Sequence, residues 1–271
     1  MAGASTPTHR IKLILAGDPG VGKSMYRLRL QENPAIQTMP TVGIDFAVFN
    51  IHSTDGGQFI QVWLNDVAGS SKFDTVAQSY LRKTNGVICI FDITDRASMY
   101  SLRDHWLPVI EKANADIISE AAAYDANLGN GARKARAIEY IIMGNKNDLT
   151  KERAVSYEEA TGFVRSVFGD APYVELSCID TRPESALLFI TPRNWLIDRI
   201  MDNEFLVRHV AANPNQNRAE YGERGTCVTR CDTCGKHGSF FFLPEGNFYI
   251  LPSFVAIVLL GCVRDIILNT T

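Results

Sequence analysis

The sequence lacks an excess of basic residues and contains few cysteines. Its 271 residues include 27 Lys and Arg against 30 Asp and Glu, which gives a net charge of −3. Because nucleic-acid-binding domains are usually strongly basic, this balance gives no reason to expect a nucleic-acid partner. Six cysteines are too few and too unevenly spaced for a disulfide scaffold. We expect Cys89 and Cys178, which lie in apolar runs, to be reduced core residues.

The N-terminus lacks an apolar stretch. Residues 1–10 are polar, so the sequence predicts no secretory signal, and we expect a cytoplasmic, reducing environment. The apolar fraction of 46% is ordinary for a globular protein with a buried core, and the length is ordinary for one α/β domain. We expect residues 1–9 to be a flexible N-terminus ahead of that domain.

Short apolar runs alternate with helical stretches. The predicted strands are residues 11–16, 46–52, 59–64, 87–93, 137–143 and 173–177, and the second and third form a hairpin. In the third, polar or aromatic residues alternate with apolar ones, which predicts one inward face and an outward Gln61, Trp63 and Asn65. The predicted helices are residues 24–30, 98–113, 157–168 and one that starts at Thr191–Pro192. This alternation indicates a mostly parallel sheet with helices on both faces.

A glycine-rich turn separates the first predicted strand from the first predicted helix and fits the pattern G-x-x-x-x-G-K-[ST]. Glycines let the backbone wrap around phosphate oxygens with its N–H groups pointing inward, and the helix adds its positive N-terminal end. The lysine supplies a charge for the outer phosphates, and the serine a hydroxyl for Mg²⁺. The strand before and the helix after disfavour a chance turn. The predicted phosphate-binding loop consists of Gly17, Asp18, Pro19, Gly20, Val21, Gly22, Lys23 and Ser24.

A second polar motif, Asn145-Lys146-Asn147-Asp148, follows the predicted strand 137–143. The carboxylate of Asp148 can accept two hydrogen bonds from the N1–H and N2–H₂ edge of guanine, a pair that adenine cannot supply. Because an unpaired buried carboxylate is costly, this one residue can exclude ATP. A polar loop after a strand is the plain alternative, which the phosphate-binding loop upstream disfavours.

Together the two motifs resemble those of the Ras superfamily of small GTPases over residues 10–205. Within that superfamily, residues 41–46, 91–95 and 153–160 are similar to segments of the Rab branch. The resemblance implies an α/β P-loop NTPase fold. This is a Ras-like three-layer sandwich with a mostly parallel six-stranded sheet and helices on both faces. It also implies binding of GTP or GDP with Mg²⁺ by a domain that spans residues 10–208.

Further residue roles are implied by the resemblance alone. Thr41 would offer its hydroxyl to Mg²⁺ and its N–H to the γ-phosphate, and Asp66 would hold Mg²⁺ through water. Gly69 would donate an N–H to the γ-phosphate, so that the two switch loops are ordered only by the third phosphate. Ser177 and Cys178 would close over the base. The implied metal-binding residues are Ser24, Thr41 and Asp66, and the implied catalytic residues are Lys23, Thr41, Gly69 and Ser70.

The sequence departs from the family pattern at several positions. Ser70 stands where the family usually has the glutamine that orients the attacking water, so we expect slow hydrolysis unless a partner supplies the missing group. Asn65 replaces a tryptophan of the Rab effector surface, which predicts a different effector. Ile179 replaces a common lysine, and no aromatic side chain that would pack on the base is evident near residues 33–35. The last two changes predict weaker nucleotide binding.

Residues 113–136 look like an insertion before the strand that leads to Asn145. The stretch is polar and rich in alanine and glycine. We interpret it as an exposed loop, since such loops accept extra length at little cost. A partner-binding element is the alternative.

The stretch 209–271 has a different composition, which predicts a variable tail, and its end lacks a prenylation box. Three thiolates and an imidazole could bind Zn²⁺ at Cys227, Cys231, Cys234 and His237. The spacing is tighter than in usual structural zinc sites, so a flexible or acylated cysteine cluster is favoured. Residues 248–268 contain an uncharged run of marginal length for a membrane span. They would form a short tail anchor, an interfacial segment or a segment packed on the domain.

Two functions from different classes remain open. The first is a switch that hydrolyses GTP in vesicle trafficking or signalling, with an effector, an exchange factor and an activating protein reading the switch loops. The second is a binding module that holds GTP and scarcely hydrolyses it, which Ser70 favours. An ATP-using P-loop kinase is disfavoured by Asp148 and by the lack of an arginine-rich lid. In each case the protein would work in the cytoplasm or on the cytoplasmic face of a membrane.

Overall fold

The computed structural model describes residues 7–31, 41, 43–52, 59–68, 80–127, 136–182 and 185–212. Its centre is a six-stranded sheet with the strand order β2-β3-β1-β4-β5-β6. Strand β2 runs antiparallel to β3, and the other neighbours pair in parallel. The strands are β1 (His9–Ala16), β2 (Ile44–His52), β3 (Phe59–Val67), β4 (Gly86–Asp92), β5 (Glu139–Asn145) and β6 (Tyr173–Glu175). The mostly parallel sheet predicted from the sequence is confirmed.

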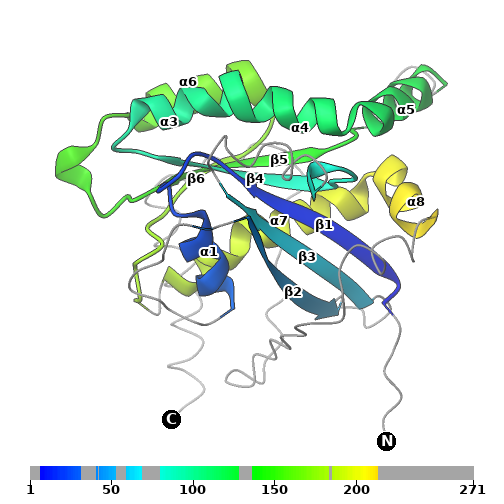
Figure 1. Ribbon diagram of the computed structural model, residues 1–271, viewed down its shortest axis with the longest axis horizontal. Coiled ribbons are helices and arrows are strands. Elements are labelled where there is room, and N and C mark those ends of the chain that lie inside the picture. The colour runs from blue at the N-terminus through cyan, green and yellow to red at the C-terminus, as the bar shows by residue number, and fades with distance from the viewer. Residues whose placement is uncertain are drawn as a thin grey trace, which may run out of the picture.

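Helices cover both faces of the sheet (Figure 1). On one side lie α3, α4 and α6, and on the other side lie α1 and α7. The helices are α1 (Lys23–Leu30), α3 (Arg96–Ser101), the π-helical η2 (Leu102–Trp106), α4 (Leu107–Ala113), α5 (Ala115–Ala126), the 3₁₀ turn η3 (Thr150–Glu152), α6 (Tyr157–Phe168), α7 (Ala186–Asp202) and α8 (Glu204–Ala212). The α/β three-layer sandwich is therefore confirmed.

The core follows from where each strand sits in the sheet. All seven residues of β4 are buried, as expected of a central parallel strand covered on both faces. In β3, Ile60, Val62 and Leu64 are buried and alternate with half-buried Gln61 and Trp63. The alternation ends at Asn65, which is fully buried. The prediction that Asn65 faces outward is thus wrong, because β3 becomes buried on both faces towards its carboxyl end.

The last large helix begins earlier than the sequence predicts. Helix α7 starts at Ala186, and Pro192 lies inside it and is buried. Thr191 is therefore no N-cap, and its hydroxyl donates to the carbonyl of Leu187 at 2.7 Å. A proline inside a helix costs roughly 3 kcal/mol. Packing overrides this cost, because a buried stripe begins before the proline with Phe189, whose carbonyl accepts the buried Tyr26 hydroxyl at 2.8 Å.

The insertion is not simply an exposed loop. Residues 115–126 form helix α5, whose Ile117 and Ala121 are buried one turn apart. Tyr124, the next residue on that stripe, packs its ring 5.7 Å from that of Phe205 on α8. The loop interpretation is thus wrong for this part, because the stripe at helical spacing outweighs the alanine and glycine content. Residues 128–135 lie outside the described residues.

Helices α3 and α4 are joined through the π-turn η2, where the sequence predicts one continuous helix. At the far end of α4, Asn114 is completely buried. Its amide donates to the carbonyls of Leu81 and Ile110, both at 2.8 Å, and its oxygen accepts the N–H of Thr84 at 3.1 Å. These bonds attach the end of α4 to the segment that leads into β4.

We therefore predict that Asn114→Ala lowers the free energy of unfolding by about 2–4 kcal/mol, because it leaves several buried backbone groups unpaired. Asn127 is the matched control, since it follows α5 as Asn114 follows α4. Its amide makes the equivalent bond to the carbonyl of Ala123 at 2.8 Å but is exposed. Asn127→Ala should change the free energy by less than about 0.5 kcal/mol in urea titrations. Equal losses in the two variants would contradict this.

Candidate nucleotide-binding site

The predicted phosphate-binding loop joins β1 to α1. The strand ends at Ala16 and the helix begins at Lys23, so the glycine-rich turn lies at the carboxyl edge of the sheet. Gly22 adopts φ +104°, a left-handed conformation that L side chains rarely adopt. A Cβ atom there would lie 2.1 Å from Nδ2 of Asn145. Glycine is thus required at this position both by the backbone angle and by the close approach of the second motif.

The ammonium group of Lys23 is held inside the loop. It donates to the carbonyls of Gly17 at 2.7 Å and Asp18 at 2.8 Å, and it lies 5.9 Å from the ring centroid of Trp106. Burial lowers the pKa of Lys23 to about 8, although the nearby carboxylates of Asp66 and Asp18 oppose this shift. A buried ammonium held only by carbonyls gains most from an incoming anion.

The side chain of Asp18 does not contact the ammonium group of Lys23. It contacts the helices that follow β4. Its Oδ1 accepts the hydroxyl of Ser101 at 2.7 Å and the indole N–H of Trp106 at 2.9 Å. The π-turn η2 ends at Trp106, and π-turns are frequent at functional sites. Neither donor is predicted from the sequence. Only the fold brings them to the loop, since they lie about eighty residues further along the chain.

The three residues that the family resemblance assigns to Mg²⁺ come together. The hydroxyls of Ser24 and Thr41 lie 2.6 Å apart. Asp66 is completely buried, and neither of its carboxylate oxygens has a hydrogen bond within the described residues. Burial raises the pKa of Asp66, while the Ser24 hydroxyl and the cations of Lys23 and Arg27 act against this rise. Two hydroxyls and a buried carboxylate whose oxygens have no hydrogen bond within the described residues fit Mg²⁺, which prefers hard oxygen ligands.

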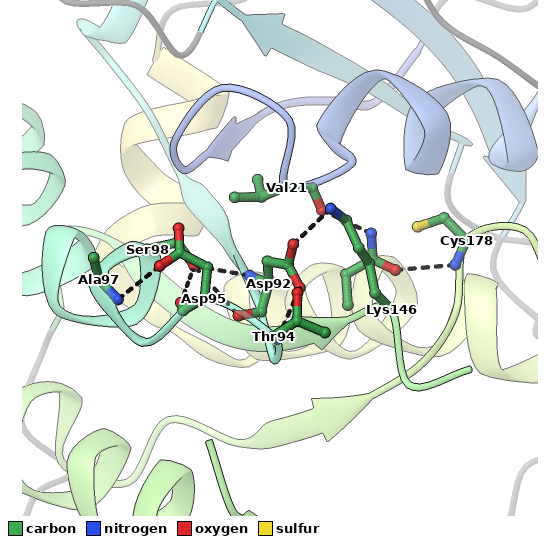
Figure 2. A network of polar contacts seen from close by, with 9 residues as sticks. Val21, Asp92, Thr94, Asp95, Ala97, Ser98, Lys146 and Cys178 are labelled. Atoms are coloured by element: carbon green, nitrogen blue, oxygen red, sulfur yellow. Dashed lines mark hydrogen bonds and ion pairs between the residues drawn. The ribbon is translucent and has the colours of Figure 1, made fainter. Parts of the chain in front are cut away.

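Asn145 joins the second motif to the first. Its Nδ2 donates to the carbonyl of Val21 at 2.7 Å, and its Oδ1 accepts the N–H of Cys178 at 3.0 Å. The side chain is 2% exposed. Three loops, after β1, β5 and β6, are thereby connected through one amide. Val21 and Cys178, the two residues that this amide contacts, are labelled in Figure 2.

Lys146 pairs with Asp92, an acid that is not among the predicted site residues. Its Nζ lies 2.5 Å from Oδ2 of Asp92, and the other Asp92 oxygen accepts the hydroxyl and the N–H of Thr94 (Figure 2). Lys146 has φ +69°, which is uncommon outside glycine and often found where function demands it. An acid at the end of β4, between β1 and β5, is at the edge where ligands bind in such sheets. This position at the end of a central strand is the signal from which Asp92 could have been predicted as a site residue.

Some of the remaining predicted residues lie within the described residues, and the others lie outside them. Asp148 is exposed at the rim, and the hydroxyl of Ser177 donates to its carboxylate. Cys178 is buried and free, as is Cys89, and burial raises the pKa of Cys178 to about 12. The predicted catalytic positions Gly69 and Ser70 lie outside the described residues. The Cys227–His237 cluster and the apolar stretch 248–268 do so as well.

The sequence is similar to those of known proteins. Residues 12–187 match the Ras family. The chain is a Ras-family small GTPase. It is 31% identical over 179 residues to Ras-related protein RABD2a of Arabidopsis thaliana, covering 65% of this chain and 76% of that protein. It is 29% identical over 196 residues to GTP-binding protein ypt1 of Schizosaccharomyces pombe, covering 72% and 83%. Ras-related protein Rab-1 of Theileria parva is 29% identical over 191 residues, covering 70% and 75%.

Membership of the family carries general properties. Ras-family proteins bind guanine nucleotides with Mg²⁺, hydrolyse GTP, and interact with exchange factors, activating proteins and effectors. The predicted phosphate-binding loop, Asp66 and Asn145 lie at the carboxyl edge of the sheet, where ligands bind in open α/β sheets. In the part of the chain that the structure describes, every helix is too short or too polar to cross a bilayer.

We predict that Gly22→Ala weakens GDP binding by at least about a hundredfold, because the new methyl group would displace Asn145 from Val21. Gly20→Ala is the matched control. Gly20 also has a positive φ, +80°, but its Cβ would meet nothing within 4 Å. This control should weaken binding by no more than about tenfold, the cost of backbone strain alone. Titration of a fluorescent GDP analogue measures both, and equal losses would show that Asn145 is not the reason.

Proposed function

We propose that this Ras-family protein is a slow molecular switch, binding GDP or GTP with Mg²⁺ through residues 17–24 and the 145–148 motif. The observation that carries the proposal is the amide of Asn145, bonded at 2.7 Å to the phosphate-binding loop and at 3.0 Å to the N–H of Cys178. This amide would hold the proposed phosphate and base sites at a fixed separation. Such an arrangement suits a ligand with phosphates at one end and a purine at the other.

In this proposal the phosphate end works by positioning and charge. Lys23 would transfer its two hydrogen bonds from loop carbonyls to phosphate oxygens, aided by loop N–H groups and the start of α1. Ser24, Thr41 and Asp66 would hold Mg²⁺, Asp66 through water. When bound, Mg²⁺ offsets the negative charge that builds up on the phosphates during transfer to water. Gly69 would add an N–H to the γ-phosphate.

At the base end, Asp148 would select guanine. It is exposed at the rim, where its carboxylate already accepts the Ser177 hydroxyl, so its free lone pairs can accept from the base edge. Lys146 would flank the base with its stem, since its ammonium is fixed on Asp92 at 2.5 Å. Ser177 and Cys178 would line the same end.

The switch itself would connect Thr41 and Gly69 to the third phosphate. The hydroxyl of Thr41 already lies 2.6 Å from that of Ser24. Loss of the γ-phosphate would remove the partner of both switch residues and release the surface that an effector reads. Because the named relatives are Rab and Ypt proteins, we place this switch in vesicle traffic or signalling, on the cytoplasmic side of a membrane. Residues 248–268 would provide membrane attachment.

A second candidate is a scaffold that holds GTP without appreciable hydrolysis. The observation that favours it is Ser70, which is too short to orient the attacking water as glutamine does. The two candidates share the nucleotide site and differ in the fate of the γ-phosphate.

We predict that Asp148→Asn weakens GDP binding by at least about a hundredfold and makes xanthosine diphosphate the preferred ligand. The asparagine NH₂ would oppose the guanine amine, whereas the 2-oxo group of xanthine can accept its hydrogen bond. Asp104→Asn, at an exposed position paired with Arg103, is the charge-matched control and should bind GDP normally. Competitive titration against a fluorescent GDP analogue measures the preference. Unchanged guanine selectivity in Asp148→Asn would refute the assigned base site.

We predict that Ser70→Gln accelerates single-turnover GTP hydrolysis at least about tenfold, because the longer amide can orient the attacking water. Ser71→Gln places the same side chain one position away and should leave the rate unchanged. Phosphate release from preloaded protein measures the rate. If the natural protein hydrolyses GTP as fast as relatives that carry glutamine, the slow switch and the scaffold are both wrong.

A further inference from the structure

A buried arginine lies beside the proposed metal site, and neither nucleotide motif includes it. Arg27 is in α1, one turn after Lys23 and Ser24, and is 8% exposed. Its stem leads the guanidinium away from solvent and towards the sheet, where α1 packs on β3. An arginine with so little exposure requires acidic partners.

The guanidinium bridges two carboxylates and the end of its own helix. One NH2 group donates to Asp45 at the start of β2, and Nε lies 3.6 Å from Oδ2 of Asp66. The other terminal nitrogen donates to Gln31 Oε1 at 2.8 Å. Nε has no hydrogen-bond acceptor within the described residues, and neither carboxylate oxygen of Asp66 has a donor there. Arg27 therefore compensates the charge of Asp66 but leaves its oxygens able to take another ligand.

The strand register explains why a cation is needed at this point. Asp45 and Asp66 are directly opposite each other in the antiparallel β2–β3 pair. Like charges in that relation destabilise a sheet, the more so because the side chain of Asp66 is completely buried. Arg27 lies against both carboxylates, so it offsets part of their negative charge within the protein.

The same two strands lead to the switch residues. Thr41 lies four positions before Asp45, and Gly69 lies three positions after Asp66. Lys23 and Arg27 are one helical turn apart, so α1 supplies the phosphate-binding cation and the cation between the strands. Asp66 thus has two side-chain cations close to it before a metal arrives.

We propose that Arg27 is a resident cation that shares Asp66 with Mg²⁺ and thereby reduces the dependence of nucleotide retention on Mg²⁺. The inference rests on the proposed nucleotide site. With the metal removed, Arg27 keeps Asp66 compensated, so the carboxylate repels the phosphates less. With the metal present, the positive charge of Arg27 weakens its binding. Arg27 is a positioning residue in this scheme and contacts neither phosphate nor metal.

The test measures release of a fluorescent GDP analogue over a range of free Mg²⁺ concentrations, ending in excess EDTA. Arg27→Gln removes the charge and keeps hydrogen-bonding capacity. It should lower the Mg²⁺ concentration for half-maximal retention about tenfold and enlarge the acceleration by EDTA at least about fivefold. Arg27→Lys keeps the charge and should stay within about threefold of the natural protein in both measurements.

Asp45→Asn should shift the Mg²⁺ concentration for half-maximal retention in the opposite direction to Arg27→Gln. Freed from Asp45, Arg27 would interact with Asp66 alone, so the Mg²⁺ requirement should rise a few-fold. In a protein that already carries Arg27→Gln, Asp45→Asn should have a smaller effect on the Mg²⁺ requirement. The difference between its effects in the two backgrounds measures the coupling between Asp45 and Arg27. Thermal unfolding with saturating GDP and Mg²⁺ shows whether each variant is folded.

Each outcome separates the inference from the function on which it rests. If the natural protein does not bind GDP, or binds it without any influence of Mg²⁺, the proposed function fails. If the natural protein responds to Mg²⁺ but Arg27→Gln speeds release equally at every Mg²⁺ concentration, Arg27 only stabilises the fold and the inference is overturned. The inference is also overturned if the Mg²⁺ concentration for half-maximal retention in Arg27→Gln lies within twofold of that of the natural protein.

Discussion

The proposed nucleotide site depends on one buried amide, the side chain of Asn145. It uses its donor on the loop after β1 and its acceptor on the loop after β6. Aspartate would lack the donor and leucine would lack both groups, so only a carboxamide of this length meets the two demands. Parallel pairing of β1, β4, β5 and β6 makes this possible, because it brings the carboxyl ends of all four strands to one edge.

The cations at this edge already have partners within the protein. Lys23 is bonded to loop carbonyls, Lys146 to Asp92, and Arg27 lies between Asp45 and Asp66. Such groups keep their positions before a ligand arrives, so binding a polyanion requires little reorganisation. The three cations would differ in whether they exchange these partners for a bound phosphate. Lys23 would give up neutral carbonyls for phosphate, a clear gain, whereas Lys146 and Arg27 would keep their carboxylates and act through position.

Local sequence patterns predicted much of this structure, but they did not predict the contacts between residues that are far apart in the chain. The loop 17–24 and helix α6 (Tyr157–Phe168) follow from motif and periodicity within one segment. Trp106, the last residue of the π-turn η2, donates to Asp18 across 88 residues of chain, and no local pattern encodes such a contact. The predicted start at Thr191–Pro192 failed since local helix-capping preferences were weaker than the buried stripe that begins with Phe189.

Helix α5, part of the predicted insertion, lies away from the proposed site. Helices α5 and α8 meet at Tyr124 and Phe205, at the end of the molecule away from the α1 loop (Figure 1). Asn203, just before α8, contacts Glu139, the first residue of β5, and so marks the amino edge of the sheet. Extra chain at that edge costs mainly loop-closure entropy. At the carboxyl edge, a single methyl group on Gly22 would already displace Asn145. The geometry therefore leaves the amino edge free to acquire new surface, while the carboxyl edge with the proposed nucleotide site stays constrained.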